Sequence, residues 1–488
     1  MSTNSRMSLA RAASRRAAVV GGALLLAACA TNPVTGRREL ALVSEQQEIA
    51  MGQEGAKQVE ATMGLVQDQE LQQYVERIGM RLAKGSQRPN LPWRFGVIDD
   101  PTPNAFALPG GPVYITRGML SLMENEAQLA TVLGHEIGHI TARHSVQQLS
   151  QQQLAQFGLG IGSILSPTVA QFGNIAAQGL QLLFLKYGRD DERESDELGF
   201  KYALAQGYDV REAGDPFRAL QRMGERQSAS GIPSWLSTHP DPGERVATAE
   251  RRAAAIQPPP TNAVVNEAGY LEQLRGLVYG ANPRDGFFEG GNYYHPELRF
   301  HLRFPQGWKT QDTPEAVVAV SPQQDAILQL TLAPAKGAQQ AAQQFFSQQG
   351  LQAGQVTRET VNGLPAVSGL FQAQTQQGTI QGLAVFLDYG GNTFQLLGYA
   401  PVQRFGTYES VFRGSASSFA RLTDPAKLNV QPARMEIERL TQPTTLASYA
   451  ARKPSAIGLE ELAVINQVED PNATLPAGTL VKRVVKGS

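Results

Sequence analysis

Two histidines and a glutamate lie close together at residues 135–139, whose sequence is His-Glu-Ile-Gly-His. Apolar residues on both sides recur at helical spacing, so we expect His135 and His139 on one face of a helix. Two imidazoles four residues apart on a helix can bind one metal ion, and Glu136 lies where it can hold a metal-bound water. The pattern predicts a metal-dependent hydrolase that binds one Zn2+ per chain.

The alternative to a metal site is a surface helix that carries two histidines by chance. A helix start is present just upstream, because Asn125 suits an N-cap and Gln128 follows it three residues later, as in a capping box. This signal favours a helix that runs through the histidine motif.

A zinc ion that keeps one position open for water needs a third protein ligand. The residues after His139 exclude one source, because Ala142 and Ser145 stand where a metzincin has a glycine and a third histidine. His144, five residues after His139, is expected to point away as a helix-surface or second-layer residue. The third ligand must come from elsewhere in the chain.

The acidic segment 189–199 is the best source of that ligand. Glu192 and Asp196 are four residues apart and share a helical face. The spacing predicts Glu192 as the third ligand and Asp196 as the acceptor of an N–H group from a metal-bound histidine. Glu194 and Glu197 fall on other faces and are expected to be solvated, with Glu194 as the alternative ligand.

Three motifs together carry a family resemblance: the helical HEIGH, R-x-x-E-x-E-S-D-x-x-G at 189–199, and S-T-H-P-D-P-G-E-R at 237–245. They resemble the HtpX and CAAX-prenyl-endopeptidase family of gluzincin metallopeptidases, in particular its BepA/LoiP-like periplasmic lipoproteins. The resemblance implies that Glu192 is the zinc ligand, which agrees with the spacing argument.

The same resemblance implies roles for His239 and Arg245, which match the histidine and the arginine of the third motif. A cationic or hydrogen-bonding side chain near the metal would stabilise an oxyanion, which makes both residues catalytic candidates. His239 is also a candidate latch that occupies the open zinc position. We favour the latch, because prolines and a glycine frame His239 on a segment able to move as a unit; a plain turn histidine is the third alternative.

A strand-like segment at 104–118 precedes the metal-binding helices. The resemblance implies that its start, Asn104, Ala105, Phe106 and Ala107, is an edge strand that pairs with extended substrate through its backbone. An ordinary core strand ending in a glycine turn is an equally compatible interpretation.

The N-terminal sequence predicts where in the cell the protein is located. Arginines precede an apolar run at 17–28 that is too short to span a membrane, which predicts a signal peptide at 1–28. The run ends in Leu-Ala-Ala-Cys, so Cys29, the only cysteine, is the expected lipidation site, and 29–44 the expected lipidated tether. Ala30 after the cysteine implies the outer membrane, facing the periplasm; plain secretion is the alternative.

The overall charge argues against one class of partner. With 43 basic and 44 acidic residues the chain has no basic field to hold the phosphates of a nucleic acid. Charged residues are also absent between Arg143 and Lys186. Repeated glutamines in this segment, 144–185, favour a helical pair that shields the cleft, or plain core helices, over a membrane hairpin.

The patterns together predict an α+β multidomain protein. Residues 45–256 suit a mainly α-helical zincin-type metalloprotease domain with a small edge sheet, and the proline-rich 257–284 a linker. Short alternating strands at 285–425 predict an α+β domain with an antiparallel sheet that weakly resembles PsbP-like domains. Residues 430–488 have the βααβ order of a LysM-like module.

LysM modules bind glycans that contain N-acetylglucosamine, so the resemblance implies peptidoglycan as a partner. The usual Gly-Asp before the first helix is replaced by Gln-Pro-Thr at 442–444, which leaves a structural or protein-docking role open. The function we expect is a zinc endopeptidase that hydrolyses unfolded or misassembled envelope proteins. The rival is a catalytically latent chaperone or scaffold.

Overall fold

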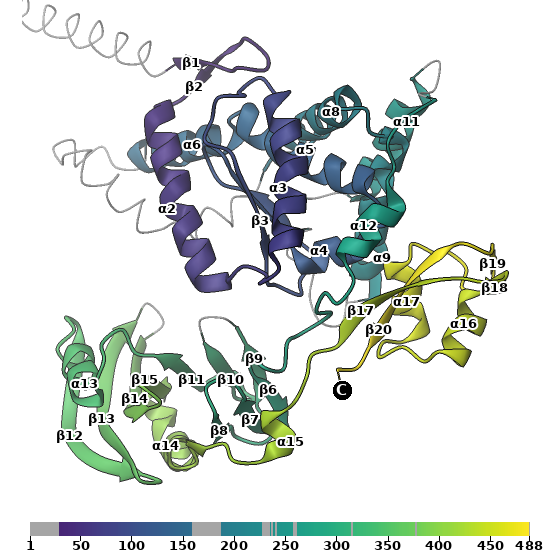
Figure 1. Ribbon diagram of the computed structural model, residues 1–488. Helices are drawn as coiled ribbons and strands as arrows, with labels where there is room; N and C mark the ends of the chain where they lie inside the picture. Colours follow the sequence, from purple (N-terminus) through teal and green to yellow (C-terminus); the bar gives the residue numbers. More distant parts are fainter. Residues whose placement is uncertain are drawn as a thin grey trace, which may run out of the picture. The chain divides into compact units, whose positions relative to one another are not determined.

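The computed structural model describes most of the chain (Figure 1). The described residues are 29–158, 187–226, 235, 238–239, 242–256, 261–313, 316–375 and 378–487. They form helices and mainly antiparallel sheets in two compact units. The first unit comprises Met1–Gly280 and Arg434–Val485, and the second comprises Ala281–Ala433 and Lys486–Ser488. The expected α+β class is therefore confirmed.

Three expected features fall wholly or partly outside the described residues. They are the signal peptide at 1–28, the 159–186 part of the uncharged stretch, and the 257–260 part of the linker. Among the helices that are described, none combines the length and the apolar character needed to cross a membrane.

The first unit begins with a short hairpin and continues with helices around a small sheet. Its elements before residue 280 are β1 (Cys29–Thr31), β2 (Arg38–Leu40), α2 (Glu45–Met63), α3 (Gln69–Lys84), β3 (Arg94–Ile98), β4 (Ala105–Ala107), β5 (Pro112–Thr116), α4 (Arg117–Leu122), α5 (Glu126–Thr141), α6 (His144–Gly158), α8 (Arg189–Ala205), the 3-10 helix η2 (Val210–Gly214), α9 (Asp215–Arg226), α11 (Pro242–Ala254) and α12 (Glu267–Gln273).

Helix α5 carries the histidine motif and begins where the sequence predicts. The side chain of Asn125 accepts a hydrogen bond of 3.0 Å from the backbone N–H of Gln128. The side chain of Gln128 in turn accepts one of 2.8 Å from the backbone N–H of Glu124. These bonds satisfy amide groups that a helix start otherwise leaves without partners. Every residue of α5 is buried.

Helices α5 and α8 pack with their backbones in close contact, and glycines at the contact make this approach possible. A Cβ atom added at Gly199 would lie 2.6 Å from the backbone nitrogen of His135. One added at Gly138 would lie 3.0 Å from Cα of Ser195. The glycine of His-Glu-Ile-Gly-His thus allows the acidic helix to reach the histidine helix.

The small sheet next to α5 has the strand order β3-β5-β4, so β4 lies at an edge. Strand β3 runs parallel to β5, whereas β4 pairs with β5 antiparallel, with Phe106 opposite Tyr114. The edge strand that the resemblance implied for 104–107 is present at Ala105–Ala107, and its pairing with substrate stays a prediction.

The N-terminal hairpin packs against the corner between α5 and α6. Strand β1 pairs with β2, and the buried Asn32 donates hydrogen bonds to the Glu39 carboxylate at 3.0 Å and to the carbonyl of Ala142 at 3.3 Å. The backbone N–H of Leu42 donates to Oγ of Ser150 at 3.0 Å. Residues from Asn32 onward are therefore part of the folded domain and not the free tether that the sequence suggested.

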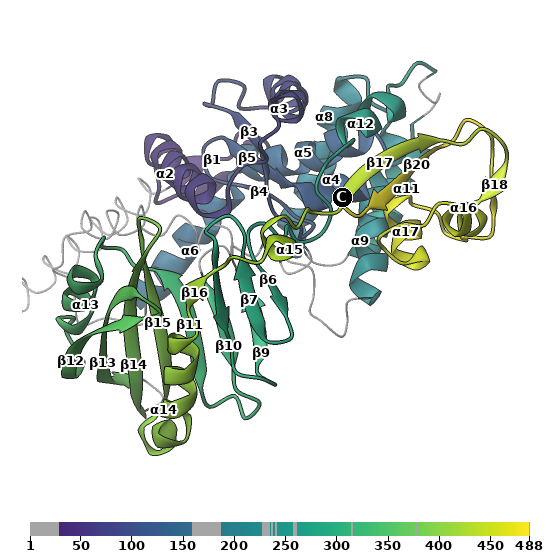
Figure 2. The same cartoon turned by 60° about the horizontal axis from the view of Figure 1, so that its bottom comes forward.

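The second unit is built on a seven-stranded antiparallel sheet of order β12-β13-β14-β15-β11-β10-β9, with a four-stranded sheet of order β16-β8-β7-β6 (Figure 2). Its elements are β6 (Phe287–Glu289), β7 (Asn292–His295), β8 (Phe300–Arg303), β9 (Lys309–Asp312), β10 (Val317–Val320), β11 (Ile327–Leu332), α13 (Ala338–Phe346), β12 (Leu351–Val361), β13 (Leu364–Thr375), β14 (Gly378–Tyr389), β15 (Asn392–Pro401), α14 (Val402–Ser417), β16 (Ala420–Arg421) and α15 (Pro425–Leu428).

Alternation along β14 gives the large sheet two buried faces. Leu383 and Val385 pack in a core with Phe412 of α14, whereas Ala384 and Phe386, which alternate with them, pack in a core around α13. Because successive side chains of a strand point to opposite faces, the two helices cover opposite sides of the sheet.

The last segment of the chain returns to the first unit. Its elements are β17 (Arg434–Arg439), β18 (Thr444–Thr445), α16 (Leu446–Arg452), α17 (Leu459–Ile465), β19 (Thr474–Leu475) and β20 (Leu480–Val485). Strands β17 and β20 pair antiparallel, so the predicted strand, helix, helix, strand order is present. The start of β17 forms an antiparallel bridge between Arg434 and Val278. The two segments of the first unit that flank the second unit in sequence therefore lie side by side.

A buried lysine fastens this C-terminal segment to the turn before α5. Lys482 is fully buried, and its ammonium group donates to the carbonyls of Ser121 at 3.0 Å and Met123 at 2.8 Å. It also lies 3.1 Å from the carboxylate of Glu124. Burial raises the pKa of Glu124 to about 7, with the Lys482 charge acting in the opposite direction. Carbonyl groups at the C-terminal end of α4, which the helix itself leaves without donors, thus accept hydrogen bonds from Lys482 of β20.

We expect Lys482→Met to lower the free energy of unfolding of the first unit by about 3 kcal/mol, because it leaves Glu124 buried without its cation and two carbonyls without a donor. Urea unfolding checks this. Adding Glu124→Gln to the same chain should recover part of the loss. Lys453→Met is the matched control, since the side chain of Lys453 is 54% exposed in its ion pair with Glu438; a loss as large there would contradict the assignment.

Candidate metal centre

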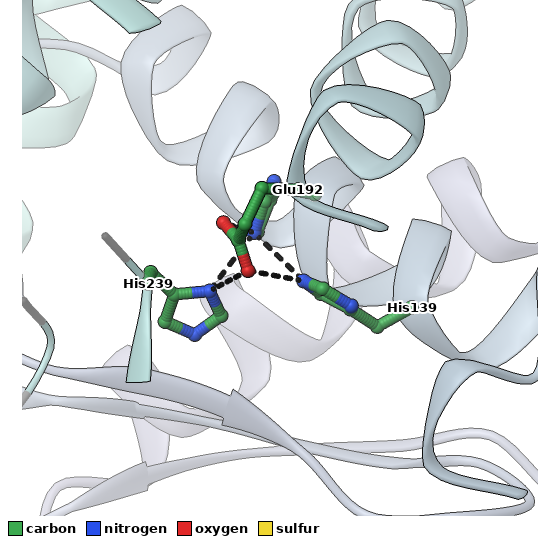
Figure 3. A group of neighbouring side chains, drawn as sticks. His139, Glu192 and His239 are labelled. Atoms are coloured by element: carbon green, nitrogen blue, oxygen red, sulfur yellow. Dashed lines mark hydrogen bonds and ion pairs between the residues drawn. The ribbon is translucent and has the colours of Figure 1, made fainter. Parts of the chain in front are cut away.

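Four side chains from three parts of the first unit converge on one point (Figure 3). His135 and His139 come from α5, Glu192 from α8, and His239 from the segment between α9 and α11. One ligand atom from each of the four lies within 4.8 Å of the others. All four residues are at most 3% exposed. In Figure 3 the imidazoles of His139 and His239 point at the carboxylate of Glu192.

The separations between these atoms suit the edges of a tetrahedral site. Nε2 of His135 lies 3.0 Å from Nε2 of His139 and 3.3 Å from Nδ1 of His239. Oε1 of Glu192 lies 3.4 Å from Nε2 of His139 and 2.9 Å from Nδ1 of His239. Zinc bonds of roughly 2.0–2.1 Å in tetrahedral geometry require ligand atoms about 3.3 Å apart. The donor set therefore fits a zinc ion.

The carboxylate predicted to orient a ligand histidine lies where the sequence placed it. Oδ1 of Asp196 is 2.9 Å from Nδ1 of His135, which turns Nε2 of that ring toward the other ligands. Arg245 lies behind this pair: its Nε is 2.9 Å from Asp196, and its Nη1 is 3.2 Å from Glu192. The guanidinium of Arg245 thus contacts two carboxylates of the site.

Aromatic rings that no motif indicated surround these groups. The guanidinium of Arg245 lies 4.1 Å from the ring centre of Phe217 and 4.6 Å from that of Trp235. The Trp235 ring stacks on His239 at 5.0 Å, and the backbone N–H of His239 donates to the carbonyl of Trp235. Trp235 is therefore part of the structure that holds His239 in the cluster.

Glu136 lies beside the cluster and is 1% exposed. Its two carboxylate oxygens have no hydrogen-bond partner among the described residues, and its Oε1 is 3.8 Å from Nε2 of His239. Burial raises the pKa of Glu136, with the neighbouring His239 and His135 acting in the opposite direction. A buried carboxylate with a raised pKa next to a metal is suited to accept a proton from water.

The charges of the site also fit a divalent cation. Burial raises the pKa of Glu192, but His239 and Arg245 outweigh it and hold that pKa well below its usual range. Burial lowers the pKa of His139, so its imidazole is neutral. Glu192 can therefore serve as an anionic ligand and His139 as a neutral nitrogen ligand, which are the forms that bind a divalent cation.

The structure corrects two expectations about the second layer. His144 is 2% exposed and lies with its Nδ1 2.9 Å from Nδ1 of His139, so the helix-surface prediction was wrong and the second-layer one is confirmed. Glu194 is not a free solvated charge, because its Oε2 lies 3.3 Å from Nε2 of His144. Glu197 is half exposed and pairs with Lys201, as expected for a surface charge. Glu194 is absent from the four-residue cluster.

Tyr187 is a further residue that the sequence did not indicate. Its ring stacks on that of His139 at 3.9 Å, and its hydroxyl lies 2.9 Å from Oγ of Ser145. It follows Lys186, the first charged residue after the uncharged stretch, and no spacing rule connects it to the histidine motif.

A histidine pair on one helix, a glutamate from a second helix and an adjacent edge strand define a metallopeptidase-type domain. Comparison with known proteins agrees: residues 69–253 match the model of peptidase family M48. Residues 69–253 are thus similar to this peptidase family.

Two kinds of relative share this domain. The chain is 32% identical over 262 residues to the beta-barrel assembly-enhancing protease of Yersinia pestis, covering 51% of this chain and 52% of that protein. It is 30% identical over 256 residues to the same protein of Escherichia coli strain K12, with the same coverage. It is 31% identical over 224 residues to the mitochondrial metalloendopeptidase OMA1 of Schizosaccharomyces pombe, covering 44% and 63%. The chain spans about half the length of the beta-barrel assembly-enhancing proteases.

A solved structure is similar to part of the chain. The solution structure of cyanobacterial PsbP from Synechocystis covers 27% of this chain and 91% of its own, at 19% identity and a TM-score of 0.23. A TM-score of this size carries no argument about the fold, and the PsbP-like character of 285–425 stays a prediction.

Two substitutions separate metal binding from catalysis. Glu192→Ala should lower zinc occupancy, because it removes one of the converging ligand atoms. Glu136→Gln should leave zinc stoichiometry near that of the wild type while peptide hydrolysis falls by several orders of magnitude, because the proton acceptor is lost. Metal analysis and peptide assays on both variants check this. Unchanged zinc in Glu192→Ala, or zinc lost from Glu136→Gln, would contradict the role concerned.

Proposed function

We propose that this chain is a zinc metalloendopeptidase that hydrolyses peptide bonds of unfolded or misassembled proteins of the bacterial cell envelope. The buried cluster of His135, His139 and Glu192, with Glu136 beside it on α5, is the observation that carries the proposal. The relatives named as proteases of β-barrel assembly support the envelope setting.

Some residues of the site would bind the metal ion, and another would transfer the proton. His135, His139 and Glu192 would hold Zn2+, which when bound polarises the scissile carbonyl and lowers the pKa of its water toward ~7. Glu136 would accept a proton from the attacking water and pass it to the leaving amine. Asp196 keeps His135 in the tautomer that ligates through Nε2. Arg245 stays a candidate for oxyanion stabilisation, although it contacts the carboxylates of Asp196 and Glu192.

The edge strand β4 suits the binding of an extended substrate. The backbone N–H of Thr116 donates to Asn104, and that of Leu108 donates to Pro112, so residues 104, 106 and 108 face β5. Because backbone direction alternates along a strand, the polar backbone groups of Ala105 and Ala107 face the other side. A substrate backbone added there would bind with little sequence preference, as degradation of unfolded proteins requires.

The proposal extends to location. The signal-like N-terminus and Cys29 support a lipidated protein of the outer membrane that faces the periplasm. The strand, helix, helix, strand order of 434–485 supports a LysM-like module, with peptidoglycan glycan as its ligand.

Proteolysis of unfolded casein by the purified full chain tests the activity. We expect cleavage that stops when a chelator removes the metal and returns when zinc is added. Glu136→Gln is the matched control, because it removes the proton acceptor and leaves the ligands in place. Casein that stays intact with zinc bound, both in the wild type and after removal of the His239 side chain, would favour the latent scaffold instead.

His239 is proposed as a latch, because its Nδ1 lies with the other ligand atoms and the site is closed. His239→Ala should then raise turnover of a short peptide and promote self-cleavage, since a competing ligand is removed. Steady-state assays with zinc content measured in parallel check this. Turnover at or below roughly one-tenth of wild type with zinc retained would instead identify His239 as an oxyanion donor.

A further inference from the structure

We propose that His144 and Glu194 are positioning residues that hold the metal ligand His139 through a directed chain of hydrogen bonds. The inference rests on the proposed zinc site and deepens it. The chain runs from Nδ1 of His139 to Nδ1 of His144 at 2.9 Å, and from Nε2 of His144 to Oε2 of Glu194 at 3.3 Å.

The donor and acceptor of each hydrogen bond in this series follow from which nitrogen of His139 faces the cluster. Nε2 of His139 lies among the ligand atoms, so it must carry the free electron pair and Nδ1 must carry the hydrogen. That hydrogen points at Nδ1 of His144, which therefore accepts. The hydroxyl of Ser195, 3.4 Å from the same nitrogen, can donate to it as well. The hydrogen of His144 then sits on Nε2 and is donated to Glu194.

Each link of the chain is held in place by its surroundings. The side chain of His144 is 1% exposed, whereas that of Glu194 is 29% exposed and keeps part of its hydration. Tyr187 stacks on His139 and limits rotation of its ring. Glu194 and Ser195 both belong to α8, the helix that supplies Glu192, so one helix provides a ligand and the support for another ligand.

The two histidine ligands are supported differently. His135 donates directly to Asp196, whose charge is paired with Arg245. His139 donates to the imidazole of His144, whose other nitrogen in turn donates to the carboxylate of Glu194. A ligand that donates its second N–H to such a partner gains basicity and a fixed ring orientation, and loss of the partner typically lowers metal affinity about 10–100-fold.

The zinc affinity of the full-length protein, measured by competition with a chromophoric chelator, tests this series of hydrogen bonds. His144→Leu removes the acceptor but fills the space, and should weaken zinc binding about 10–100-fold. His144→Asn places Oδ1 where Nδ1 was, so it should restore most of that affinity. Glu194→Ala should weaken binding, and Glu194→Gln, which can still accept from Nε2–H, should weaken it less. Glu197→Gln is the control, because Glu197 lies on the same helix in an exposed pair with Lys201.

Visible absorption of the cobalt-substituted protein adds a readout that a purely structural role would not change. His144→Leu should shift the ligand-field bands, and His144→Asn should return them toward wild type. Wild-type affinity in His144→Leu, or equal losses in His144→Leu and His144→Asn, would overturn the proposal. If His144→Leu does not fold, Glu194→Ala with unchanged affinity and spectrum overturns it. Affinity is measured without cleavage, so a chain that binds zinc but cleaves nothing contradicts the endopeptidase function and not this inference.

Discussion

The close contact between α5 and α8 is the constraint on which the metal centre depends. At Gly199 the two backbones approach so closely that a Cβ atom would lie 2.6 Å from the nitrogen of His135. Because a metal site tolerates displacements of only about 0.5 Å, a shift of about 1 Å between the helices would separate Glu192 from the histidines. The same contact places Asp196 on His135 and Glu194 near His144, so one helix pair determines both ligand geometry and ligand support.

The sequence predicted the parts of the site that depend on spacing within a helix. His135 and His139 are four residues apart on α5, and Glu192 and Asp196 are four apart on α8, so helical periodicity alone brings each pair to one face. The start of α5 was predictable for the same reason, since a cap involves residues only three apart. Short strands within 285–425, such as Ile327–Leu332, also follow from local alternation.

Contacts made across the chain were beyond that reasoning. His144 was expected to point away from the site, as a helix-surface or second-layer residue. The turn at Arg143, whose φ is 60°, instead places His144 beside His139 and next to Ser195 and Glu194 of α8. Lys482 belongs to the segment expected to form a LysM-like module, yet it is buried beside Glu124, 358 residues earlier in the chain. Asn32 likewise gains its role from the carbonyl of Ala142. No periodicity connects such positions, because each depends on how complete elements pack.

The surroundings of His239 determine how the closed site can open. His239 is held from one side by Glu192 and from the other by the Trp235 ring and carbonyl, so release of the histidine requires Trp235 to move as well. The positions of the other three candidate metal ligands do not depend on a movement of Trp235. Arg245 lies on α11 and keeps its contacts with Asp196 and Glu192, while His139 is backed by His144 on α6. If His239 acts as the proposed latch, a substrate that favours the open state has to outweigh only the contacts of His239 and Trp235. The site would then gain an open position while His135, His139 and Glu192 keep their order.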